Sequence, residues 1–381
     1  MKWTFNNNYP SVDDLRAKAM SRIPKFAFEY LDGGCNDDVN LKKNTIELRQ
    51  TELLPYYLKN HTGSSLQTEL FGHLYDAPFG IAPVGLQGLI WPHAAEILAK
   101  ASHTHNIPFI LSTVSTADIE TIAGITEGKA WFQLYHPAEN SLRDDIIRRL
   151  QDYDYPVLVL LSDVPSFGYR PRDIRNGLAM PPRMTLNNIL QIMGRPAWAL
   201  HTLKYGQPSF KTMEKYMPKG LNMQQLGQYM NATFSGRLNK EKVSAIRDKW
   251  KGKLVLKGVA SEQDTAMAIE LGLDGIIVSN HGGRQLDAAQ SSVASLHTIL
   301  KAYQSKIKIM LDSGIRSGPD VARAMANGAE FTFLGRSLMY GVAALGDTGG
   351  DHAIAILKTE LQQVMEQLCC EKTENLYKHR V

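Results

Sequence analysis

The stretch GIIVSNHGGRQLD, residues 275–287, begins with apolar residues and ends in polar residues around a pair of glycines. An apolar run that stops at polar side chains is typical of a buried parallel strand with chemistry at its carboxyl end. His281 can accept a proton near neutral pH, and Arg284 can hold a carboxylate through two parallel hydrogen bonds. Gly282 and Gly283 permit unusual turn dihedrals and would let a flat ligand approach the backbone. The stretch predicts a site for an acid with an ionisable hydrogen, and the alternative is a core strand that ends in an incidental histidine.

Seven further short apolar runs occur along the chain, and amphipathic stretches separate them. Helices are expected at residues 261–272, 290–303 and 318–328. A strand followed by a helix, repeated eight times, predicts an α/β fold of the (β/α)₈ TIM-barrel type, with the site at the carboxyl ends of the strands. The expected strands lie in FGIAPV (79–84), PFILSTV (108–114), AWFQLY (130–135), VLVLL (157–161), KLVLKGV (253–259), GIIVSN (275–280), IKIMLDSG (307–314) and FTFLGR (331–336).

Two segments fall outside this repeat. Residues 11–50 indicate short helices, because Ser11 can cap one helix and Pro24 can open the next. The interval between the fourth and fifth runs is far longer than the others, so a long insertion follows strand four. We expect one domain over residues 1–381, with an N-terminal helical segment at 1–75, the barrel at 78–368 and the insertion at 166–240.

Charge and cysteine content exclude several classes of protein. The formal net charge of +4, without a block of Lys and Arg, argues against a nucleic-acid partner. Cys35, Cys369 and Cys370 are odd in number and two are adjacent, so neither a disulfide framework nor a metal site is expected. No signal peptide or membrane-spanning run is visible. We therefore expect a cytoplasmic protein whose membrane contact, on the inner face of the cell membrane, would be peripheral.

Polar side chains stand at the carboxyl ends of other expected strands. Gln133 and Tyr135 end the third run, and Asp163 follows the fourth. Lys257 lies within the fifth run, where an unpaired ammonium would be costly, and so indicates function. Tyr30 and Tyr135 could instead be packing residues, and Asp163 could form a turn before Pro165. The seventh and eighth runs end in Gly and Arg, which together predict a phosphate-binding cup.

The nonapeptide SNHGGRQLD (279–287) resembles the signature of the FMN-dependent 2-hydroxy-acid-oxidising family, which includes glycolate oxidase, L-lactate dehydrogenase and mandelate dehydrogenase. The resemblance runs from FEYLDGG (28–34) to FLGRSLMYG (333–341) and so covers nearly the whole chain. Within the family, the segments most similar to mandelate dehydrogenase, and next to L-lactate dehydrogenase, are GLQGLIWP (85–92), FGYRPRDIRNG (167–177) and YGVAALGDTG (340–349).

This resemblance implies an enzyme that converts an (S)-2-hydroxy acid into a 2-oxo acid and passes electrons to a quinone or another acceptor. It also implies a homo-oligomer, a tetramer. His281 would be the base with Asp163 beside it, and Lys257 would stabilise the reduced flavin. Tyr30, Tyr135, Arg170 and Arg284 would hold the substrate, Tyr135 also acting in catalysis. FMN would be lined by Pro83, Val84, Gly85, Ser112, Gln133, Lys257, Ser279, Asp312, Ser313, Gly314, Arg316, Gly335 and Arg336.

One position departs from the family pattern. Where the family usually has a threonine two residues before the aspartate, this chain has Leu161, so a hydroxyl that would reach the flavin is missing. Ser162 cannot replace it, because adjacent strand residues face opposite sides. Two rival functions stay open, an oxygen-dependent oxidase that produces hydrogen peroxide and a flavin- or phosphate-binding barrel without turnover. A binder has no need of a base, which speaks against the second.

The insertion has an unusual composition. Residues 166–220 carry nine Lys and Arg against Asp173 and Glu214, a local charge of nine minus two, or +7. Apolar residues among these cations predict an interface, and an anionic membrane leaflet would attract the cations. A lid or an oligomer contact is the alternative. The residues of this predicted surface, 176–220, are Leu178, Met180, Met184, Leu186, Ile189, Leu190, Ile192, Met193, Trp198, Leu200, Leu203, Phe210 and Met213 with Arg183, Arg195, Lys204, Lys211, Lys215 and Lys219.

Overall fold

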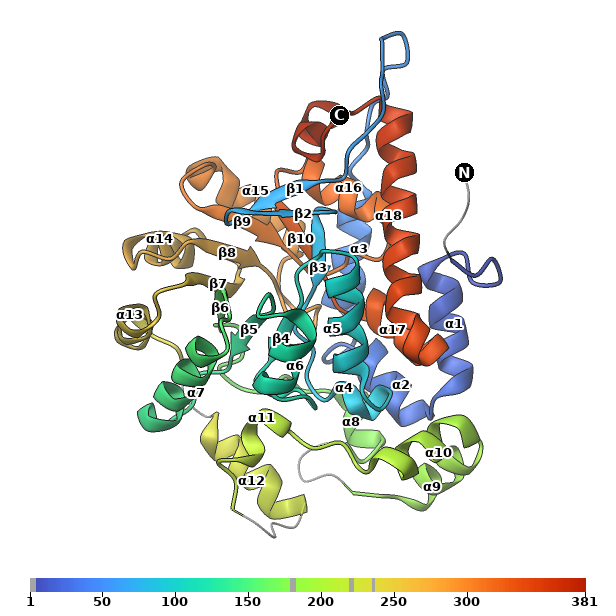
Figure 1. The fold of residues 1–381 in the computed structure, drawn as a ribbon, viewed down its shortest axis with the longest axis vertical. Helices are drawn as coiled ribbons and strands as arrows, with labels where there is room; N and C mark the ends of the chain where they lie inside the picture. The colour runs from blue at the N-terminus through green and yellow to red at the C-terminus, as the bar shows by residue number, and fades with distance from the viewer. Residues whose placement is uncertain (1–4, 179–182, 219–222, 235–236) are drawn as a thin grey trace.

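The centre of the protein, in a computed structural model that describes residues 5–178, 183–218, 223–234 and 237–381, is a parallel barrel (Figure 1). The strand order is β3-β10-β9-β8-β7-β6-β5-β4, and a parallel bridge between Ile81 and Phe109 joins the two ends. The predicted TIM barrel is therefore confirmed. Its strands are β3 (Phe79–Ile81), β4 (Ile110–Ser112), β5 (Trp131–Leu134), β6 (Val157–Leu161), β7 (Lys253–Val259), β8 (Gly275–Val278), β9 (Lys308–Leu311) and β10 (Phe331–Leu334).

Each strand lies within its predicted run, but most are shorter. The last residues of the runs turn into loops at the carboxyl ends, where the candidate site residues stand. Alternate strand residues point into the barrel, because successive side chains of a strand face opposite sides. These interior residues, all buried, are Ala82, Ile110, Trp131, Val157, Val159, Val255, Ile277, Met310, Phe331 and Phe333.

Helices surround the barrel, and the outward-facing strand residues pack against them in the main hydrophobic core. The three helices predicted around residues 261–272, 290–303 and 318–328 are present as α14, α15 and α16. The bounds of the surrounding helices are α4 (Gln87–Ile90), α5 (Ala94–Thr104), α6 (Ile119–Thr126), α7 (Asn140–Asp152), α13 (Lys240–Lys249), α14 (Glu262–Glu270), α15 (Ser292–Tyr303), α16 (Gly318–Ala326), α17 (Arg336–Leu345) and α18 (Gly349–Leu368), with 3₁₀ turns at Gly346–Thr348 and Thr373–His379.

The N-terminal segment forms three helices, α1 (Val12–Arg22), α2 (Lys25–Asp32) and α3 (Val39–Arg49). The predicted cap at Ser11 is present, since its hydroxyl accepts from the Asp14 amide while the Asp14 carboxylate accepts from the Ser11 amide. The predicted helical segment at 1–75 is wrong beyond α3, because the chain there becomes extended and ends in a hairpin, β1 (Thr68–Leu70) and β2 (His73–Tyr75).

This hairpin closes the amino end of the barrel. Phe71, between its strands, contacts Trp131 inside the barrel with ring centroids 5.7 Å apart, and Tyr75 contacts Phe331 at 5.7 Å. The sequence patterns did not reveal the hairpin, because its strands are only three residues long. With one end closed by aromatic rings, the opposite end of the barrel is left for the site.

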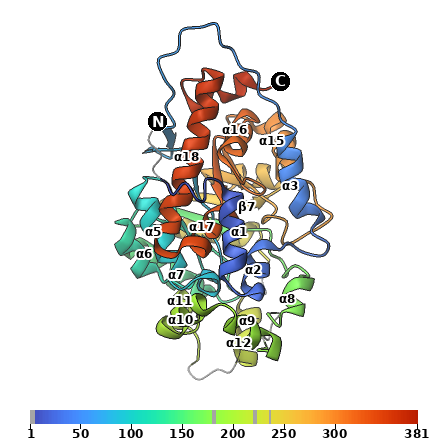
Figure 2. The same ribbon diagram turned by 90° about the vertical axis from the view of Figure 1, so that its right-hand side faces the viewer.

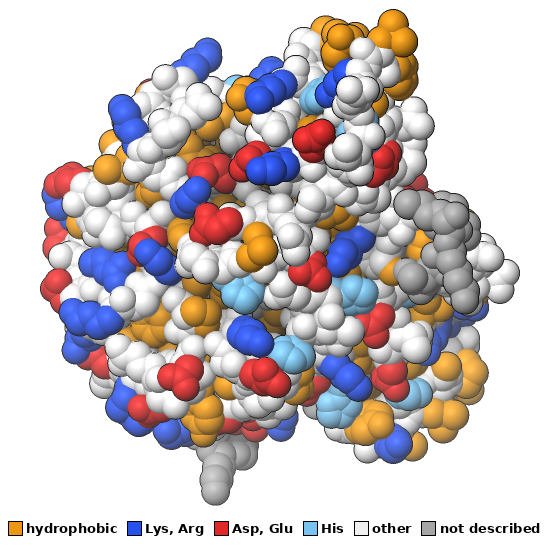
Figure 3. Space-filling model, turned by 45° about the horizontal axis from the view of Figure 1, so that its top comes forward, with side chains coloured by type: hydrophobic (Ala, Val, Ile, Leu, Met, Phe, Trp, Pro, Cys, Tyr) orange, Lys and Arg blue, Asp and Glu red, His pale blue; other side chains and the backbone are white. Residues whose placement is uncertain are grey.

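The insertion after β6 covers that opposite end (Figures 1 and 2). It contains α8 (Pro171–Arg175), α9 (Leu186–Met193), α10 (Pro196–Tyr205), α11 (Lys211–Glu214) and α12 (Met223–Thr233). The face of the molecule seen in Figure 3 carries interspersed acidic and basic side chains, with hydrophobic side chains gathered at its upper edge. Among the helices of the described residues, none is long and apolar enough to cross a bilayer.

Candidate active site

A cavity of about 1320 Å³ opens at the carboxyl ends of the strands, between the barrel and the insertion. Most of the side chains predicted from sequence line it. Ser112, Gln133, Asp163 and Ser279 are not among its lining residues. The lining residues among the predicted set are Tyr30, Pro83, Val84, Gly85, Tyr135, Arg170, Lys257, His281, Arg284, Asp312, Ser313, Gly314, Arg316, Gly335 and Arg336.

His281 and Asp163 form a hydrogen-bonded pair at the edge of this cavity. The distance from His281 Nδ1 to Asp163 Oδ1 is 3.0 Å. A carboxylate acceptor favours the tautomer with the proton on Nδ1, which leaves Nε2 able to accept a proton. Burial lowers the pKa of His281, against an opposing effect of Asp163, and Lys257 lowers it further. The imidazole is therefore neutral at neutral pH, as a base must be.

The ion pair of Lys257 and Asp312 lies next to this base. Lys257 Nζ is 2.8 Å from Asp312 Oδ2 and donates to Ser279 Oγ at 2.9 Å. Burial by itself would lower the pKa of Lys257, but the carboxylates of Asp312 and Asp163 raise it above its ordinary value. The ammonium is thus a fixed positive charge, because both neighbours favour the charged form.

A bulge in β7 lets Asp163 approach Lys257. The register between β7 and β8 shifts between Lys257 and Val259, and Gly258 has a φ of +93°. A Cβ atom at Gly258 would lie 2.6 Å from the Cβ of Asp163. Glycine is needed here both for the backbone conformation and for the space that Asp163 occupies.

Gly282 and Gly283, after His281, are explained by packing within the protein rather than by the predicted approach of a flat ligand. The left-handed turn is confirmed, with φ values of +58°, +66° and +72° at His281, Gly282 and Gly283. However, a Cβ at Gly282 would lie 2.5 Å from Arg336 Nη1, and one at Gly283 would lie 2.4 Å from the Leu41 amide nitrogen. The missing Cβ atoms make room for the protein itself, so the expectation that they admit a flat ligand is not needed to explain them.

Arg284 and Arg170 face the cavity from two loops. Arg284 Nη1 donates to the carbonyls of Tyr30 and Gly33 at 2.7 and 2.9 Å, and its guanidinium lies 5.1 Å from the centre of the Tyr30 ring. Burial lowers the pKa of Arg284 to about 10, and neighbouring Arg170 contributes to the shift. Arg170 Nη2 donates to Gln285 Oε1 at 3.3 Å, while its buried Nε has no partner among the described residues. Two adjacent guanidinium groups with unused donors fit a carboxylate ligand.

A second group of positive charges forms at the ends of β9 and β10. Burial and the charges of Arg316 and Arg284 lower the pKa of Arg336 to about 9. The three side-chain nitrogens of Arg336 donate to the carbonyls of Leu31, Gly282 and Gly33, so it supplies charge and also ties loops together. Gly335 caps the amino end of α17, whose amides favour an anion. This arrangement fits a phosphate group.

Two predicted lining residues have structural partners. Ser313 donates to Asp312 at 2.8 Å and accepts from the Gly282 amide at 2.9 Å. A Cβ at Gly85 would lie 2.9 Å from Val114 Cγ2, so glycine there also serves packing. Both residues still border the cavity.

Leu161 ends β6 on the interior face, since it lies two residues after the interior residue Val159 and is paired in register with Lys257. Its side chain is buried. Ser162 faces away, and its hydroxyl donates to the Lys257 carbonyl at 2.8 Å. The serine hydroxyl is therefore used by the backbone and does not replace the missing threonine hydroxyl.

Sequence reasoning missed three residues that hold the site together. Gln285 Nε2 donates to the Asp163 carbonyl at 3.2 Å, while its Oε1 accepts from Arg170. Arg172 pairs with Asp38, beside the loop that follows α2. Gln285 lies within the quoted nonapeptide and could have been found there, whereas no sequence pattern links Arg172 to Asp38.

Comparisons with known proteins agree with this geometry. The profile of the FMN-dependent dehydrogenase family matches residues 19–381. An L-lactate dehydrogenase from Vibrio parahaemolyticus is 36% identical over 353 residues, which cover 92% of this chain and 93% of the relative. The (S)-mandelate dehydrogenase of Pseudomonas putida is 35% identical over 374 residues, with 97% and 93% covered.

Solved structures give the same result. The crystal structure of the monotopic membrane protein (S)-mandelate dehydrogenase matches with a TM-score of 0.93 and 34% identity, covering 99% of this chain and 100% of that one. A mandelate oxidase structure matches with a TM-score of 0.82 and 29% identity, covering 97% of each chain.

The buried ion pair yields a prediction. Lys257→Met should lower the free energy of unfolding by about 3 kcal/mol, because removing one partner leaves Asp312 buried without its counter-charge. The double variant Lys257→Met/Asp312→Leu should recover much of that loss. Urea denaturation of the purified proteins measures both, and equal destabilisation of the single and double variants would contradict the pairing.

Proposed function

Because the chain belongs to the FMN-dependent dehydrogenase family, we propose that it oxidises a lactate- or mandelate-like (S)-2-hydroxy acid to the 2-oxo acid. FMN is the cofactor of this family. The observation that carries the proposal is that His281, hydrogen-bonded to Asp163, borders the same cavity as Arg284 and Arg170. A base and a carboxylate clamp in one cavity are what a 2-hydroxy acid requires.

The residues of the cavity fit FMN. The amino end of α17 and the guanidinium of Arg316 would hold its phosphate. Lys257, fixed by Asp312, would supply the positive charge that stabilises the reduced flavin. FMN supplies the two-electron redox chemistry, and the protein supplies binding, orientation and charge.

The protein's own side chains bind the substrate and transfer its proton. Arg284 and Arg170 bind the substrate carboxylate and so fix the position of its α carbon. His281 Nε2 removes a proton from the substrate, and Asp163 stabilises the imidazolium that results. Tyr30 and Tyr135 line the same cavity, where their hydroxyls can orient the substrate. Burial and the Asp163 charge raise the pKa of Tyr135, so its hydroxyl keeps its proton and can donate.

The electron acceptor we propose is a quinone. The cavity reaches beyond the base to apolar side chains of α4 and α10, including Leu89, Ile90 and Trp198, so an apolar acceptor could approach. The similarity to a mandelate oxidase supports oxygen as the alternative acceptor. Aerobic peroxide formation by the reduced protein would favour oxygen, and reoxidation by a soluble quinone analogue without peroxide would favour the quinone.

We propose that α9 and α10 dock on a membrane surface. The (S)-mandelate dehydrogenase with a similar structure is a monotopic membrane protein. Many apolar side chains of this surface are exposed, whereas Trp198, Phe210 and Met213 are buried and Met180 and Lys219 lie outside the described residues. The exposed ones are Met184, Leu186, Ile189, Leu190, Met193, Leu200 and Leu203.

Positive charge contributes less to the proposed membrane docking than the sequence of this segment predicts. Lys211 pairs with Glu214, and Lys215 pairs with Asp145 on α7. The cations therefore partly neutralise acidic groups of the protein itself, and the docking we propose depends mainly on apolar contact. The homotetramer implied by the family resemblance stays a prediction.

The assignment of the base can be tested with His281→Ala. This variant should keep FMN but lose at least ~10² in the rate of flavin reduction by substrate, because general-base catalysis typically contributes about 10² to 10⁴. Anaerobic stopped-flow bleaching of the flavin measures the rate. In the parent protein, kcat/KM should fall as pH decreases through the lowered pKa of His281, below the ordinary value of 6.5. Near-normal bleaching of the variant would exclude His281 as the base.

A second prediction concerns Leu161→Thr. The variant should bind FMN at least as well as the parent and should shift the flavin potential, because the threonine hydroxyl would donate to a flavin acceptor. A buried hydrogen-bond acceptor left without a donor costs about 1 to 3 kcal/mol. Fluorescence titration of the apoprotein and dye-linked potentiometry measure the two quantities. If affinity falls and the potential stays unchanged, another donor already fills that place.

The membrane proposal predicts that the protein cosediments with anionic vesicles and that added salt weakens this in part. Leu186→Ser/Leu200→Ser should reduce cosedimentation, because these side chains are 74% and 66% exposed on α9 and α10. The matched control is Leu54→Ser/Leu58→Ser, which changes two leucines, 65% and 92% exposed, in the segment between α3 and β1. Figure 1 shows this segment at the end of the molecule opposite α9 and α10. Equal loss in both variants would argue against docking through α9 and α10.

A further inference from the structure

Residues 33–38, the link between α2 and α3, lie between the two loops that carry the substrate arginines. The Cys35 amide donates to the Gly283 carbonyl at 2.9 Å, one residue from Arg284. The Asn36 amide donates to the Tyr169 carbonyl at 2.8 Å, one residue from Arg170. The link therefore sets the separation of the loops after β6 and β8.

Close backbone contacts strengthen this arrangement. A Cβ at Gly34 would lie 2.6 Å from the Gly283 carbonyl oxygen, and a Cβ at Gly168 would lie 2.2 Å from that of Arg284. Since no side chain could fit at either place, the link and the two loops touch through their main chains. A small movement of the link would therefore also displace the backbone next to Arg284 and Arg170.

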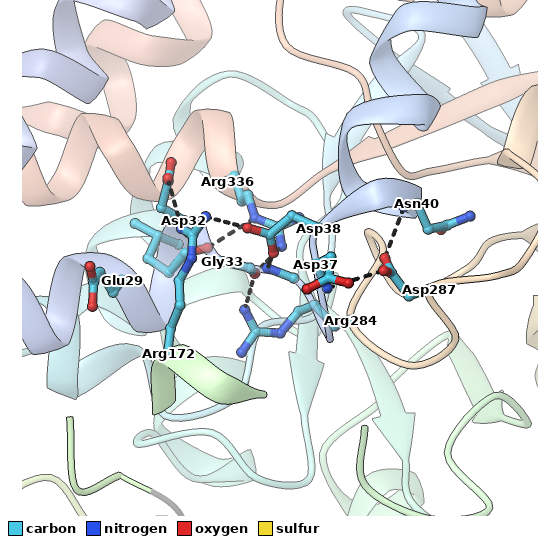
Figure 4. Close-up of polar contacts among 12 residues, drawn as sticks. Glu29, Asp32, Gly33, Asp37, Asp38, Asn40, Arg172, Arg284, Asp287 and Arg336 are labelled. Atoms are coloured by element: carbon cyan, nitrogen blue, oxygen red, sulfur yellow. Dashed lines mark hydrogen bonds and ion pairs between the residues drawn. The ribbon is translucent and has the colours of Figure 1, made fainter. Parts of the chain in front are cut away.

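The carboxyl end of α2 also holds two guanidinium groups directly. The Gly33 carbonyl accepts from Arg284 at 2.9 Å and from Arg336 at 2.7 Å (Figure 4). Carbonyls at the end of a helix lack helical partners and carry partial negative charge, so they suit cations. The place of Gly33 thus determines where Arg284 points.

Arg172, at the start of α8 in the insertion, reaches across this link (Figure 4). Its Nη2 donates to Asp38 Oδ2, and its Nη1 lies 3.7 Å from Asp32 Oδ2. Asp38 Oδ1 in turn accepts from the Gly34 amide at 2.7 Å. The Cδ of Arg172 would be 3.3 Å from a Cβ at Gly33, so the side chain packs over that glycine. Arg172 therefore contacts both ends of the link.

We propose that Arg172 is a positioning residue for carboxylate binding. By holding Asp38 and Asp32, it fixes the link so that the Gly33 carbonyl keeps Arg284 in place opposite Arg170. This inference rests on the proposed function, because it assumes that these two arginines bind the substrate carboxylate. Arg172 itself is not among the residues that line the cavity, so it would act through the link rather than on the substrate.

The competing explanation is that Arg172 only stabilises the fold. The expected size of its contribution to stability separates this explanation from a positioning role. The Arg172 side chain is 33% exposed and that of Asp38 is 8% exposed, so this partly solvated ion pair adds less to stability than the buried pair of Lys257 and Asp312. Asp32 also has two other partners, Arg16 at 2.7 Å and the Tyr340 hydroxyl at 2.7 Å, which would keep α2 in place. Loss of Arg172 should accordingly disturb geometry more than folding.

The test compares Arg172→Ala with Arg175→Ala in the FMN-loaded protein. Arg175 is an exposed residue of the same helix, so its removal takes away an equal charge. Binding of a 2-oxo acid is read from the change in the flavin absorption spectrum, and KM and kcat are measured with the best 2-hydroxy acid. Arg172→Ala should weaken binding and raise KM by about tenfold, since small misplacements of binding groups are costly. Its kcat should change less, and Arg175→Ala should behave as the parent.

Two further variants test whether Arg172 acts through its ion pair with Asp38. Arg172→Lys should recover part of the affinity, because an ammonium can still pair with Asp38 but lacks the planar fork. Asp38→Asn combined with Arg172→Ala should weaken binding no more than Arg172→Ala does, as expected for two residues that act as a pair.

Three outcomes would overturn the proposal. The first is equal binding by Arg172→Ala and Arg175→Ala. The second is a loss of affinity in Arg172→Ala that is matched by a fall in melting temperature and FMN content, because that would show general loosening. The third is a loss of affinity in the double variant that equals the sum of the losses in Arg172→Ala and Asp38→Asn measured separately. Failure of the parent protein to bind or oxidise any 2-hydroxy or 2-oxo acid would instead contradict the proposed function.

Discussion

The concentration of positive charge at the carboxyl end of the barrel is the constraint on which the site depends. Arg284, Arg336 and Arg316 lie close enough that burial and mutual repulsion lower the pKa of Arg336 to about 9. Such a cluster is tolerable only where other groups compensate the charge. Main-chain carbonyls of α2 and the following glycines supply part of that compensation, and anionic ligands would supply the rest.

The compensation explains why an N-terminal segment outside the barrel belongs to the site. The carbonyls of Tyr30, Leu31 and Gly33 hold Arg284 and Arg336, and helix α2 presents them because its last carbonyls have no helical partners. On the other side of the cavity, Asp312 and Asp163 hold Lys257 and His281. Main-chain carbonyls therefore hold Arg284 and Arg336, whereas carboxylates hold Lys257 and the neutral His281. This difference keeps the arginines available to anions while Lys257 is fixed.

The insertion after β6 combines two tasks. Arg170, just before α8, borders the cavity, and α8 is tied to the N-terminal segment through Arg172. Its next helices, α9 and α10, are buried on one side through Trp198 and expose leucines on the other. One segment thus connects Arg170, which we propose binds the substrate, with the surface that we propose docks on a membrane.

Local patterns in the sequence determined the barrel and much of the site. Alternating apolar runs identified all eight strands, because strands buried on both faces must be apolar throughout. The polar ends of those runs identified His281 and Asp163, a charge within an apolar run identified Lys257, and the structure brings these three side chains together. Ser11 was recognisable as a cap, since capping depends only on residues three apart.

Only the tertiary structure decided which distant groups meet. The pairs Arg172–Asp38 and Arg336–Gly33 join residues separated by 134 and 303 positions, and no periodicity encodes such contacts. The hairpin β1–β2 escaped detection because its three-residue strands are too short to show a pattern. The purpose of Gly282 and Gly283 was also hidden, since it depends on Arg336 and α3 occupying the space where their Cβ atoms would lie. Sequence patterns report the local backbone and burial, whereas packing between remote segments fixes where each side chain points.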